Sequence, residues 1–181
     1  LIYGPCGRIL SSKGLSKFVA DYVQMIQTNA ERLNNLIHEL IEFRRIETGN
    51  REVRVESLNV SSIMKGIAKT FVEMAKSRNI TFLSKIPEQV MWNSDKGFLN
   101  TIIINLISNA FKYTPNGKMI TVFIREDEGT VSVGVQDQGI GIAENKRKSL
   151  FVRFENLVDK NIFNQASSGI GLSLVKELVE M

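Results

Sequence analysis

The sequence predicts an α+β protein: a helical hairpin followed by an α/β sandwich of a mixed sheet with helices on one face. Two observations indicate this fold class. Residues 1–48 contain almost no strand signal and carry a long helical repeat, whereas residues 53–181 alternate strand-like and helix-like segments. Because the composition changes near residue 49, we place one domain at residues 1–49 and a second at residues 53–181.

The helical hairpin is predicted from apolar residues at alternating gaps of four and three positions, the period of a coiled-coil seam. The repeat consists of Val19, Val23, Ile26, Ala30, Leu33, Ile37 and Leu40. Tyr22, Leu36 and Phe43 widen this stripe, which is typical of a helix in a four-helix bundle. Gly49 is expected to provide the left-handed cap that ends the helix.

A single helix pair would leave this seam exposed to solvent. Two pairs bury it, so we expect a homodimer through residues 1–49 that forms a four-helix bundle. The alternative is that the seam packs on the second half of the same chain. Residues 1–10 resemble the end of an earlier helix that is interrupted by Gly4 and Pro5, and a hinge is expected near residues 49–52.

The second domain is predicted from strand-like and helix-like segments in a definite order. The expected strands lie at residues 53–60, 80–86, 90–92, 119–125 and 130–136, the last two as a hairpin, and the expected helices at 61–78, 95–112 and 172–181. Ser61 or Ser62 is expected to cap the first helix, and Ser94 or Asp95 the second. The polar segment at residues 155–168 is interpreted as a mobile loop.

Composition excludes several classes of protein. The 181 residues are 43% hydrophobic and 23% charged, which is ordinary for a globular protein. No apolar run reaches the roughly 18 residues that a membrane span requires. The single cysteine, Cys6, excludes an internal disulfide framework, and the single histidine, His38, excludes a multi-histidine metal centre. The net charge of +4 is spread along the chain, which argues against nucleic-acid binding.

The first candidate for chemistry is a pair of asparagines on the predicted helix at residues 95–112. Asn105 and Asn109 are four positions apart and therefore share a helix face. Their amide oxygens could hold a hard cation such as Mg²⁺ together with its waters, and Lys112 supplies a point charge suited to phosphate. Taken alone, the pair could equally be two exposed polar residues on an amphipathic helix.

Two glycine-containing turns are the other candidates. Asp137 ends an apolar strand, where its carboxylate could accept a hydrogen bond from an exocyclic amine. Gly139 and Gly141 would let a flat ring approach the backbone, although a tight turn is the alternative. Gly169 and Gly171 directly precede a helix, whose first N–H groups could face an anion. A helix start capped within the chain is the alternative there.

The order and spacing of these motifs resemble the ATP-binding catalytic domain of sensor histidine kinases, within the gyrase, Hsp90 and histidine kinase ATPase superfamily. The matching segments are residues 105–113 for the N box, 137–142 for the G1 box, 151–154 for the F box and 167–172 for the G2 box. Residues 33–49 resemble the second helix of the dimerisation and histidine-phosphotransfer domain. The segment from Tyr3 onward resembles hybrid two-component sensors of the Bacteroides type.

The resemblance implies a set of residues that bind Mg-ATP. They are Asn105, Asn109, Lys112, Tyr113, Asp137, Gly139, Gly141, Ile142, Phe154, Gly169, Gly171 and Leu172. Asn109 would ligate Mg²⁺ directly and Asn105 through water, while Asp137 would receive the adenine amino group. Lys112 would meet phosphate, and Tyr113 would line the nucleotide site.

The resemblance also implies a lid at residues 155–168, with Phe151 and Phe154 anchoring its start. Gly169, Gly171 and Leu172 would close over the triphosphate. Arg153 is a further candidate for a contact to phosphate. Ser167 takes the place of the first glycine of the G2 box. From this substitution we expect a modest change in lid flexibility and no loss of nucleotide binding.

The implied activity is that of a sensor histidine kinase in a two-component system. The γ-phosphoryl group of ATP would pass to a histidine and then to an aspartate of a response-regulator receiver domain, separate or fused. His38 lacks the proline of the family's acceptor motif and lies on the second helix. The resemblance places the acceptor upstream of residue 1, so this chain is expected to bind nucleotide without labelling itself.

The resemblance further implies the cytoplasmic portion of an inner-membrane sensor, attached to the membrane through upstream segments. The family continues past residue 181, so C-terminal strands of the sheet are expected to be missing. Two alternatives stay open. One is another ATPase of the same superfamily, against which the helical segment argues. The other is a non-enzymatic dimerisation scaffold with a degenerate nucleotide site, against which Asn105, Asn109 and Asp137 argue.

Overall fold

The computed structural model describes residues 2–12, 14–49, 51–153 and 169–181, apart from the side chains of residues 32, 35, 38, 39 and 47. The chain divides into two compact units, Leu1–Asn50 and Arg51–Met181. None of the helices in the described residues is both long and apolar enough to cross a membrane.

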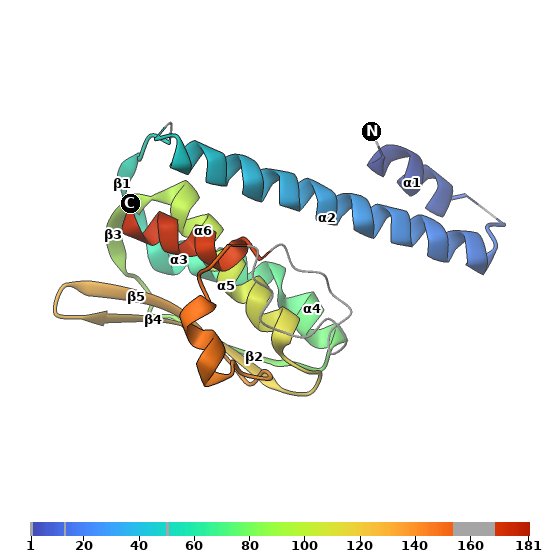
Figure 1. Ribbon diagram of the computed structural model, residues 1–181. Helices are drawn as coiled ribbons and strands as arrows, with labels where there is room; N and C mark the ends of the chain where they lie inside the picture. The colour runs from blue at the N-terminus through green and yellow to red at the C-terminus, as the bar shows by residue number, and fades with distance from the viewer. Residues whose placement is uncertain (1, 13, 50, 154–168) are drawn as a thin grey trace. The chain divides into compact units, whose positions relative to one another are not determined.

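The first unit consists of two helices that contact each other, α1 (Tyr3–Leu10) and α2 (Lys17–Glu47) (Figure 1). The prediction that Gly4 and Pro5 interrupt the first helix is wrong. Both residues lie in the first turn of α1, where a proline ring costs little because the first N–H groups of a helix have no intrahelical partner.

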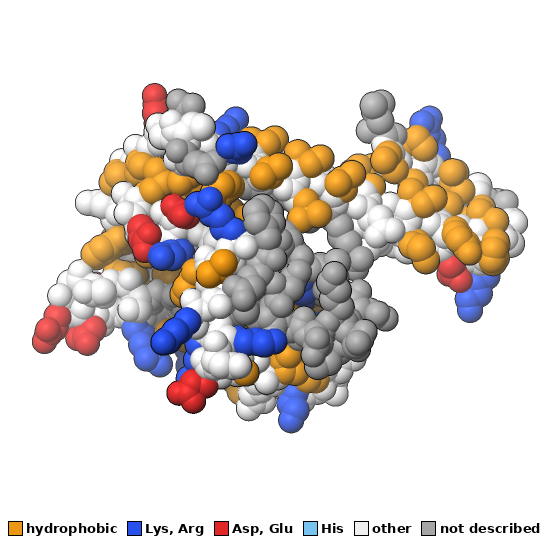
Figure 2. Space-filling model, viewed as in Figure 1, with side chains coloured by type: hydrophobic (Ala, Val, Ile, Leu, Met, Phe, Trp, Pro, Cys, Tyr) orange, Lys and Arg blue, Asp and Glu red, His pale blue; other side chains and the backbone are white. Residues whose placement is uncertain are grey.

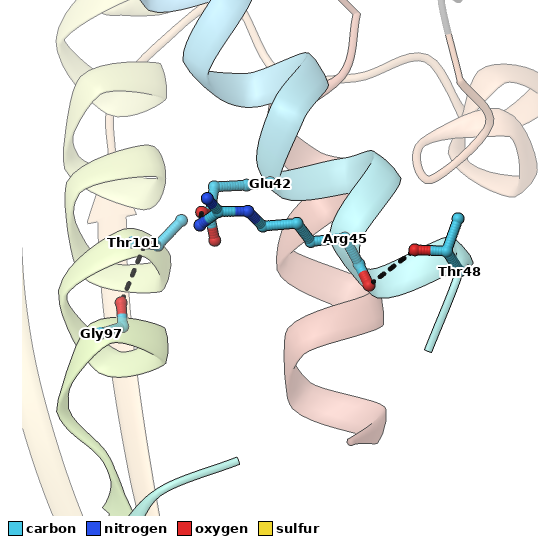
Figure 3. A network of polar contacts seen from close by, with 5 residues as sticks. All are labelled: Glu42, Arg45, Thr48, Gly97 and Thr101. Atoms are coloured by element: carbon cyan, nitrogen blue, oxygen red, sulfur yellow. Dashed lines mark hydrogen bonds and ion pairs between the residues drawn. The ribbon is translucent and has the colours of Figure 1, made fainter. Parts of the chain in front are cut away.

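The two ends of α2 are closed by local hydrogen bonds. Ser16 caps the start, where its hydroxyl accepts from the Val19 N–H at 3.3 Å. At the other end, the Thr48 hydroxyl donates to the carbonyl oxygens of Arg44 at 2.9 Å and Arg45 at 3.4 Å. Gly49 follows with a φ of 65°, the left-handed conformation predicted for it. Figure 3 shows Thr48 with its contact to Arg45.

The second unit alternates strands and helices (Figure 1). Its elements are β1 (Val55–Asn59), α3 (Val60–Thr70), α4 (Val72–Ser77), β2 (Thr81–Lys85), β3 (Met91–Asp95), α5 (Lys96–Tyr113), β4 (Met119–Asp127), β5 (Thr130–Asp137), the 3-10 helix η1 (Glu144–Ser149) and α6 (Gly171–Glu180). The helix expected at 61–78 is divided into α3 and α4 at Phe71. The Phe71 ring stacks on the Phe111 ring, with 5.4 Å between the ring centroids.

The strands form two sheets. The order in the larger is β2-β4-β5, with β2 parallel to β4 and β4 antiparallel to β5, so this sheet is mixed as predicted. β1 and β3 form a separate antiparallel pair. Helices α3, α5 and α6 lie on one face of the larger sheet (Figure 1). Alternate residues of β4 face these helices, and their side chains are buried together with those of α3 and α5.

The caps of the two long helices in this unit differ in how well the sequence predicted them. Asp95 caps α5, where its Oδ1 accepts from the Phe98 N–H at 3.0 Å, as expected. The prediction of Ser61 or Ser62 for α3 is wrong. The cap is Asn59, the last residue of β1, whose Oδ1 accepts from the Ser62 N–H at 2.9 Å. The strand therefore runs directly into the helix without a separate turn.

Asp95 also attaches the start of the second unit to α5. Its Oδ2 accepts from the Arg54 N–H at 2.9 Å. Burial alone would raise the pKa of the Asp95 carboxyl. Hydrogen bonds from the N–H groups of Arg54, Phe98 and Gly97, together with the charge of Arg51, outweigh burial and lower this pKa below its ordinary value. The carboxylate therefore stays ionised and fixes residues 51–54 against the start of α5.

Candidate functional site

Helix α5 carries the two predicted asparagines on a half-buried face. The Asn105 side-chain N–H donates to the Thr101 carbonyl oxygen at 2.9 Å, and the Thr101 hydroxyl donates to the Gly97 carbonyl oxygen at 2.9 Å. Figure 3 shows the second of these contacts. The Asn105 amide nitrogen is held in this way, and its Oδ1 accepts no hydrogen bond from the residues that the structure describes. Asn109 lies one turn further along the same face.

The start of α6 lies against Asn105. A Cβ atom added at Gly171 would come within 2.6 Å of the Asn105 Oδ1, so another residue here would displace either the Asn105 amide or the start of α6. Gly169 has a φ of 68°, which other residues rarely adopt. The N-cap position of α6, Ile170, makes no side-chain cap hydrogen bond to the first turn. The isoleucine side chain has no polar atom, so Ile170 itself offers no side-chain acceptor to the first N–H groups of α6.

The other end of α5 lies against the turn that follows β5. The Tyr113 carbonyl oxygen accepts from the Ile140 N–H at 3.3 Å. A Cβ atom added at Gly139 would come within 2.7 Å of that carbonyl oxygen and within 2.5 Å of the Asp137 Oδ1. Because one of these atoms belongs to the backbone, glycine is required at this second contact. The glycines of two separate motifs pack against the two ends of the segment from Asn105 to Tyr113.

Asp137 is exposed at the end of β5, opposite Ile120 of β4. Its Oδ1 accepts from the Gly139 N–H at 2.8 Å. The other carboxylate oxygen accepts no hydrogen bond from the part of the chain that the structure describes. Gln138 anchors the turn to β4, because its N–H donates to the Met119 carbonyl oxygen and its Oε1 accepts from the Met119 N–H. This arrangement leaves one fixed acceptor available to a donor outside the chain.

The remaining predicted site residues differ in how far the structure places them. The Lys112 ammonium lies 5.3 Å from the centre of the Tyr113 ring. Gly141 and Ile142 are exposed, and Leu172 is half-buried in the first turn of α6. Phe154 and the expected lid at residues 155–168 lie outside the described residues.

Arg153, a candidate phosphate contact, forms an ion pair with Glu177 of α6 at 3.4 Å. Two other residues that shape the site were not predicted from the sequence. Thr101 orients Asn105, and Arg78 binds the C-terminal turn of α5. The spacing of Thr101 and Asn105 on one helix was a usable signal for the first. The second is a contact between segments more than thirty positions apart, which no local pattern indicates.

Comparison with known proteins assigns part of the chain to a family. Residues 94–181 match the family described as Histidine kinase-, DNA gyrase B-, and HSP90-like ATPase. This segment is a domain of that ATPase family. The chain is also 33% identical to Histidine kinase P4 of Formosa agariphila over its whole length, and it spans 14% of that relative. A second relative, Sensor histidine kinase TmoS of Ectopseudomonas mendocina, is 30% identical over the whole chain, which spans 19% of it.

Solved structures show the same fold. Full-length ShkA in complex with AMPPNP has a TM-score of 0.77 at 20% identity, covering 99% of this chain and 37% of that one. The histidine kinase ThkA in complex with the response regulator protein TrrA has a TM-score of 0.65 at 21% identity. The match covers 89% of this chain and 47% of that one. This likeness confirms the predicted mixed sheet with helices. The ATPase domain therefore contains the asparagine helix and both glycine turns.

In the second unit, we predict that Gly171→Ala displaces the start of α6 or the Asn105 amide and lowers the free energy of unfolding by about 1–3 kcal/mol, the usual range for overpacking. The matched control is Gly66→Ala in α3, where an added Cβ meets nothing within 4 Å. That change is expected to stabilise the second unit by up to about 1 kcal/mol. Urea unfolding measures both variants, and equal effects from the two would contradict the close approach.

Proposed function

We propose that the ATPase domain binds ATP along α5, between the Gly139 turn and the start of α6. The observation that carries this proposal is the approach of Gly139 and Gly171 to the two ends of the segment from Asn105 to Tyr113. Two turns with exposed backbone and one polar helix face suit a ligand with a flat base at one end and anionic groups at the other. The ShkA structure, which is a complex with AMPPNP, supports a nucleotide as the ligand.

Asp137 would recognise the base. Its second carboxylate oxygen can accept a hydrogen bond from the exocyclic amine of adenine, while the Gly139 N–H fixes the first. A charged acceptor strengthens such a bond relative to a neutral one. The ring of Tyr113, which is half-buried beside this turn, would line the site.

The phosphates would lie toward the start of α6. Its first N–H groups and the positive end of the helix dipole favour an anion there.

The described residues contain no group of three or more His, Cys, Asp or Glu able to hold a metal ion. Amide oxygens of Asn109 and Asn105 fit Mg²⁺ only as one or two of its six ligands, with phosphates and waters as the others. When bound, Mg²⁺ neutralises charge on the phosphates. Lys112 would add a second positive charge.

The chemistry would be transfer of the γ-phosphoryl group to a histidine nitrogen. A P–N bond forms, the P–O bond to the β-phosphate breaks, and ADP leaves with the electron pair of that bond. The phosphoryl group then passes to an aspartate of a receiver domain. The names of the relatives support this reaction, and the ThkA–TrrA complex supports a response regulator as partner. We propose that the acceptor is a histidine other than His38, in a membrane-attached sensor of which this chain is a cytoplasmic part.

We predict that the unmodified chain binds ATP more tightly with Mg²⁺ than without it, and that Asp137→Asn weakens this binding about tenfold to a hundredfold. An asparagine can still accept from the Gly139 N–H, but it then presents a donor to the adenine amine, and the unmade hydrogen bond costs about 1–3 kcal/mol. Isothermal titration calorimetry measures both effects. The control is Asp127→Asn at the far end of the β4–β5 hairpin, which should leave binding unchanged.

Two results would move the assignment to one of the alternatives. Absence of ATP binding by the unmodified chain would favour a dimerisation scaffold with a degenerate site. Steady ATP hydrolysis without transfer to any histidine, when a histidine-containing partner segment is supplied, would favour another ATPase of the superfamily.

We also propose that the first unit forms a homodimer. Hydrophobic side chains run along α2, as Figure 2 shows, and most of the seam is exposed within one chain, including Ile26, Leu33 and Leu40. Leu33 retains 57% of its surface. A contiguous apolar stripe of this length on one helix is typical of a surface that is buried in an assembly. Val23 of the same seam is already buried within the unit.

We predict that the unmodified chain is a dimer at micromolar concentration and that Leu33→Asp raises its dissociation constant at least about tenfold, because an unpaired carboxylate would be buried in the bundle. The control is Val179→Asp in α6, which is 67% exposed in the second unit and should leave the dimer intact. Sedimentation equilibrium measures the association. A monomeric unmodified chain, or equal weakening by both changes, would favour packing of the seam within one chain.

A further inference from the structure

Arg78 binds the end of α5 and the residues just after it with all three nitrogens of its guanidinium group. Nη1 donates to the carbonyl oxygen of Phe111, and Nη2 donates to that of Thr114 at 2.6 Å. Nε donates to the Asn116 Oδ1 at 2.9 Å. In the reverse direction, the Arg78 carbonyl oxygen accepts from the Gly117 N–H at 3.2 Å. One residue therefore contacts four positions at and just after the end of α5.

These contacts suit the chemistry of a helix end. The last carbonyl oxygens of a helix have no intrahelical donor, and they carry the negative end of the helix dipole. A guanidinium group supplies a positive charge and several donors in one plane, so it fixes the positions of the groups it bridges as well as neutralising them. Arg78 is half-buried, which limits competition from water.

The backbone that carries Arg78 is itself well fixed. Arg78 follows the last residue of α4, and its N–H donates to the Met74 carbonyl oxygen at 3.2 Å. Asn79 then adopts a φ of 50°, in the left-handed region, and the Ile80 N–H donates to the Ala75 carbonyl oxygen at 2.8 Å. This is the hydrogen bond of a Schellman helix end. The guanidinium therefore extends from a closed helix terminus rather than from a loose loop.

The turn that Arg78 fixes also holds the adenine side of the proposed site. Phe111 and Thr114, whose carbonyl oxygens it binds, flank Tyr113, whose carbonyl oxygen accepts from the Ile140 N–H. The same Tyr113 oxygen is the backbone atom that an added Cβ at position 139 would approach most closely, at 2.7 Å. A rotation of this last turn would therefore move the Gly139 turn and, with it, the carboxylate of Asp137.

We propose that Arg78 is a positioning residue for nucleotide binding. It holds the last turn of α5 so that the turn from Asp137 to Ile140 is formed before the nucleotide arrives, and it does not itself contact the nucleotide. This inference rests on the proposed function, because it assigns a cause to the affinity of that site. Preorganisation of this kind raises affinity by removing the cost of ordering a loop on binding.

The test compares Arg78→Met with Asn59→Ala, which removes the cap of α3 in the same unit. Both variants are expected to lower the midpoint of thermal unfolding. Only Arg78→Met is expected to weaken ATP binding, by about tenfold, which corresponds to about 1.4 kcal/mol. Asn59→Ala should leave the dissociation constant within about twofold of its original value, because the hydrogen bond that it removes joins Asn59 to Ser62, outside the proposed site.

A second readout needs no ligand. In the chain without ATP, Arg78→Met is expected to speed hydrogen exchange at the Ile140 amide relative to the Val60 amide, which donates to the Val90 carbonyl oxygen at 2.9 Å. Arg78→Lys keeps the charge but cannot bridge the same three acceptors, so it should resemble the Met variant in both readouts. If the Met variant does not fold, the Lys variant provides the same comparison.

The outcomes separate the two proposals. If the unmodified chain does not bind ATP, the proposed function fails and the role of Arg78 fails with it. If the unmodified chain binds ATP, but Arg78→Met binds as well as Asn59→Ala and leaves Ile140 exchange unchanged, only the inference about Arg78 is overturned. Full affinity in Arg78→Lys would likewise contradict it, since charge without the three-way contact would then suffice.

Discussion

The close approach of two glycines to helix α5 is the constraint on which the site depends. Gly171 lies where a Cβ atom would meet the Asn105 side chain, and Gly139 lies where one would meet the Tyr113 backbone. These glycines come from turns more than thirty positions apart in the sequence. Because the rise per residue of an α-helix is constant, α5 fixes the distance between the asparagine face and the turn that carries Asp137.

Both ends of α5 are fixed by charged side chains of the sign that a helix dipole favours. At the start, the Asp95 carboxylate caps the first turn and holds the Arg54 backbone. At the end, the guanidinium of Arg78 binds the last carbonyl oxygens. A negative charge at the N-terminus and a positive one at the C-terminus each stabilise a helix. The element that positions the site is thus anchored at both ends, as well as along its buried face.

The sequence predicted the elements that show a strong local pattern. The helix carrying Asn105, the β4–β5 hairpin and the Asp95 cap were confirmed, since periodicity and cap chemistry are properties of neighbouring residues. The cap of α3 was predicted wrongly because Asn59 is both the last residue of β1 and the N-cap, with no turn between strand and helix to mark the boundary. The separation of β1 and β3 from the larger sheet depends on pairing between distant segments, which no local pattern specifies.

The candidate site shows the same division. Its motif residues were predicted from their types and spacing, and the structure brings Asn105 to Gly171 and Tyr113 to Gly139. Arg78 could not be predicted, because its partners are backbone carbonyl oxygens, which leave no trace in residue identity. Backbone groups that receive long-range hydrogen bonds are generally invisible to sequence patterns.

Amide chemical shifts on addition of Mg-AMPPNP test the central claim most directly, namely that one nucleotide contacts both glycine turns along α5. We expect the largest shifts at Gly139, Ile140 and Gly171, with little change at the β1–β3 pair. Shifts at one turn alone, or a response confined to α2 in the first unit, would contradict the claim that α5 spaces the two turns for a single ligand.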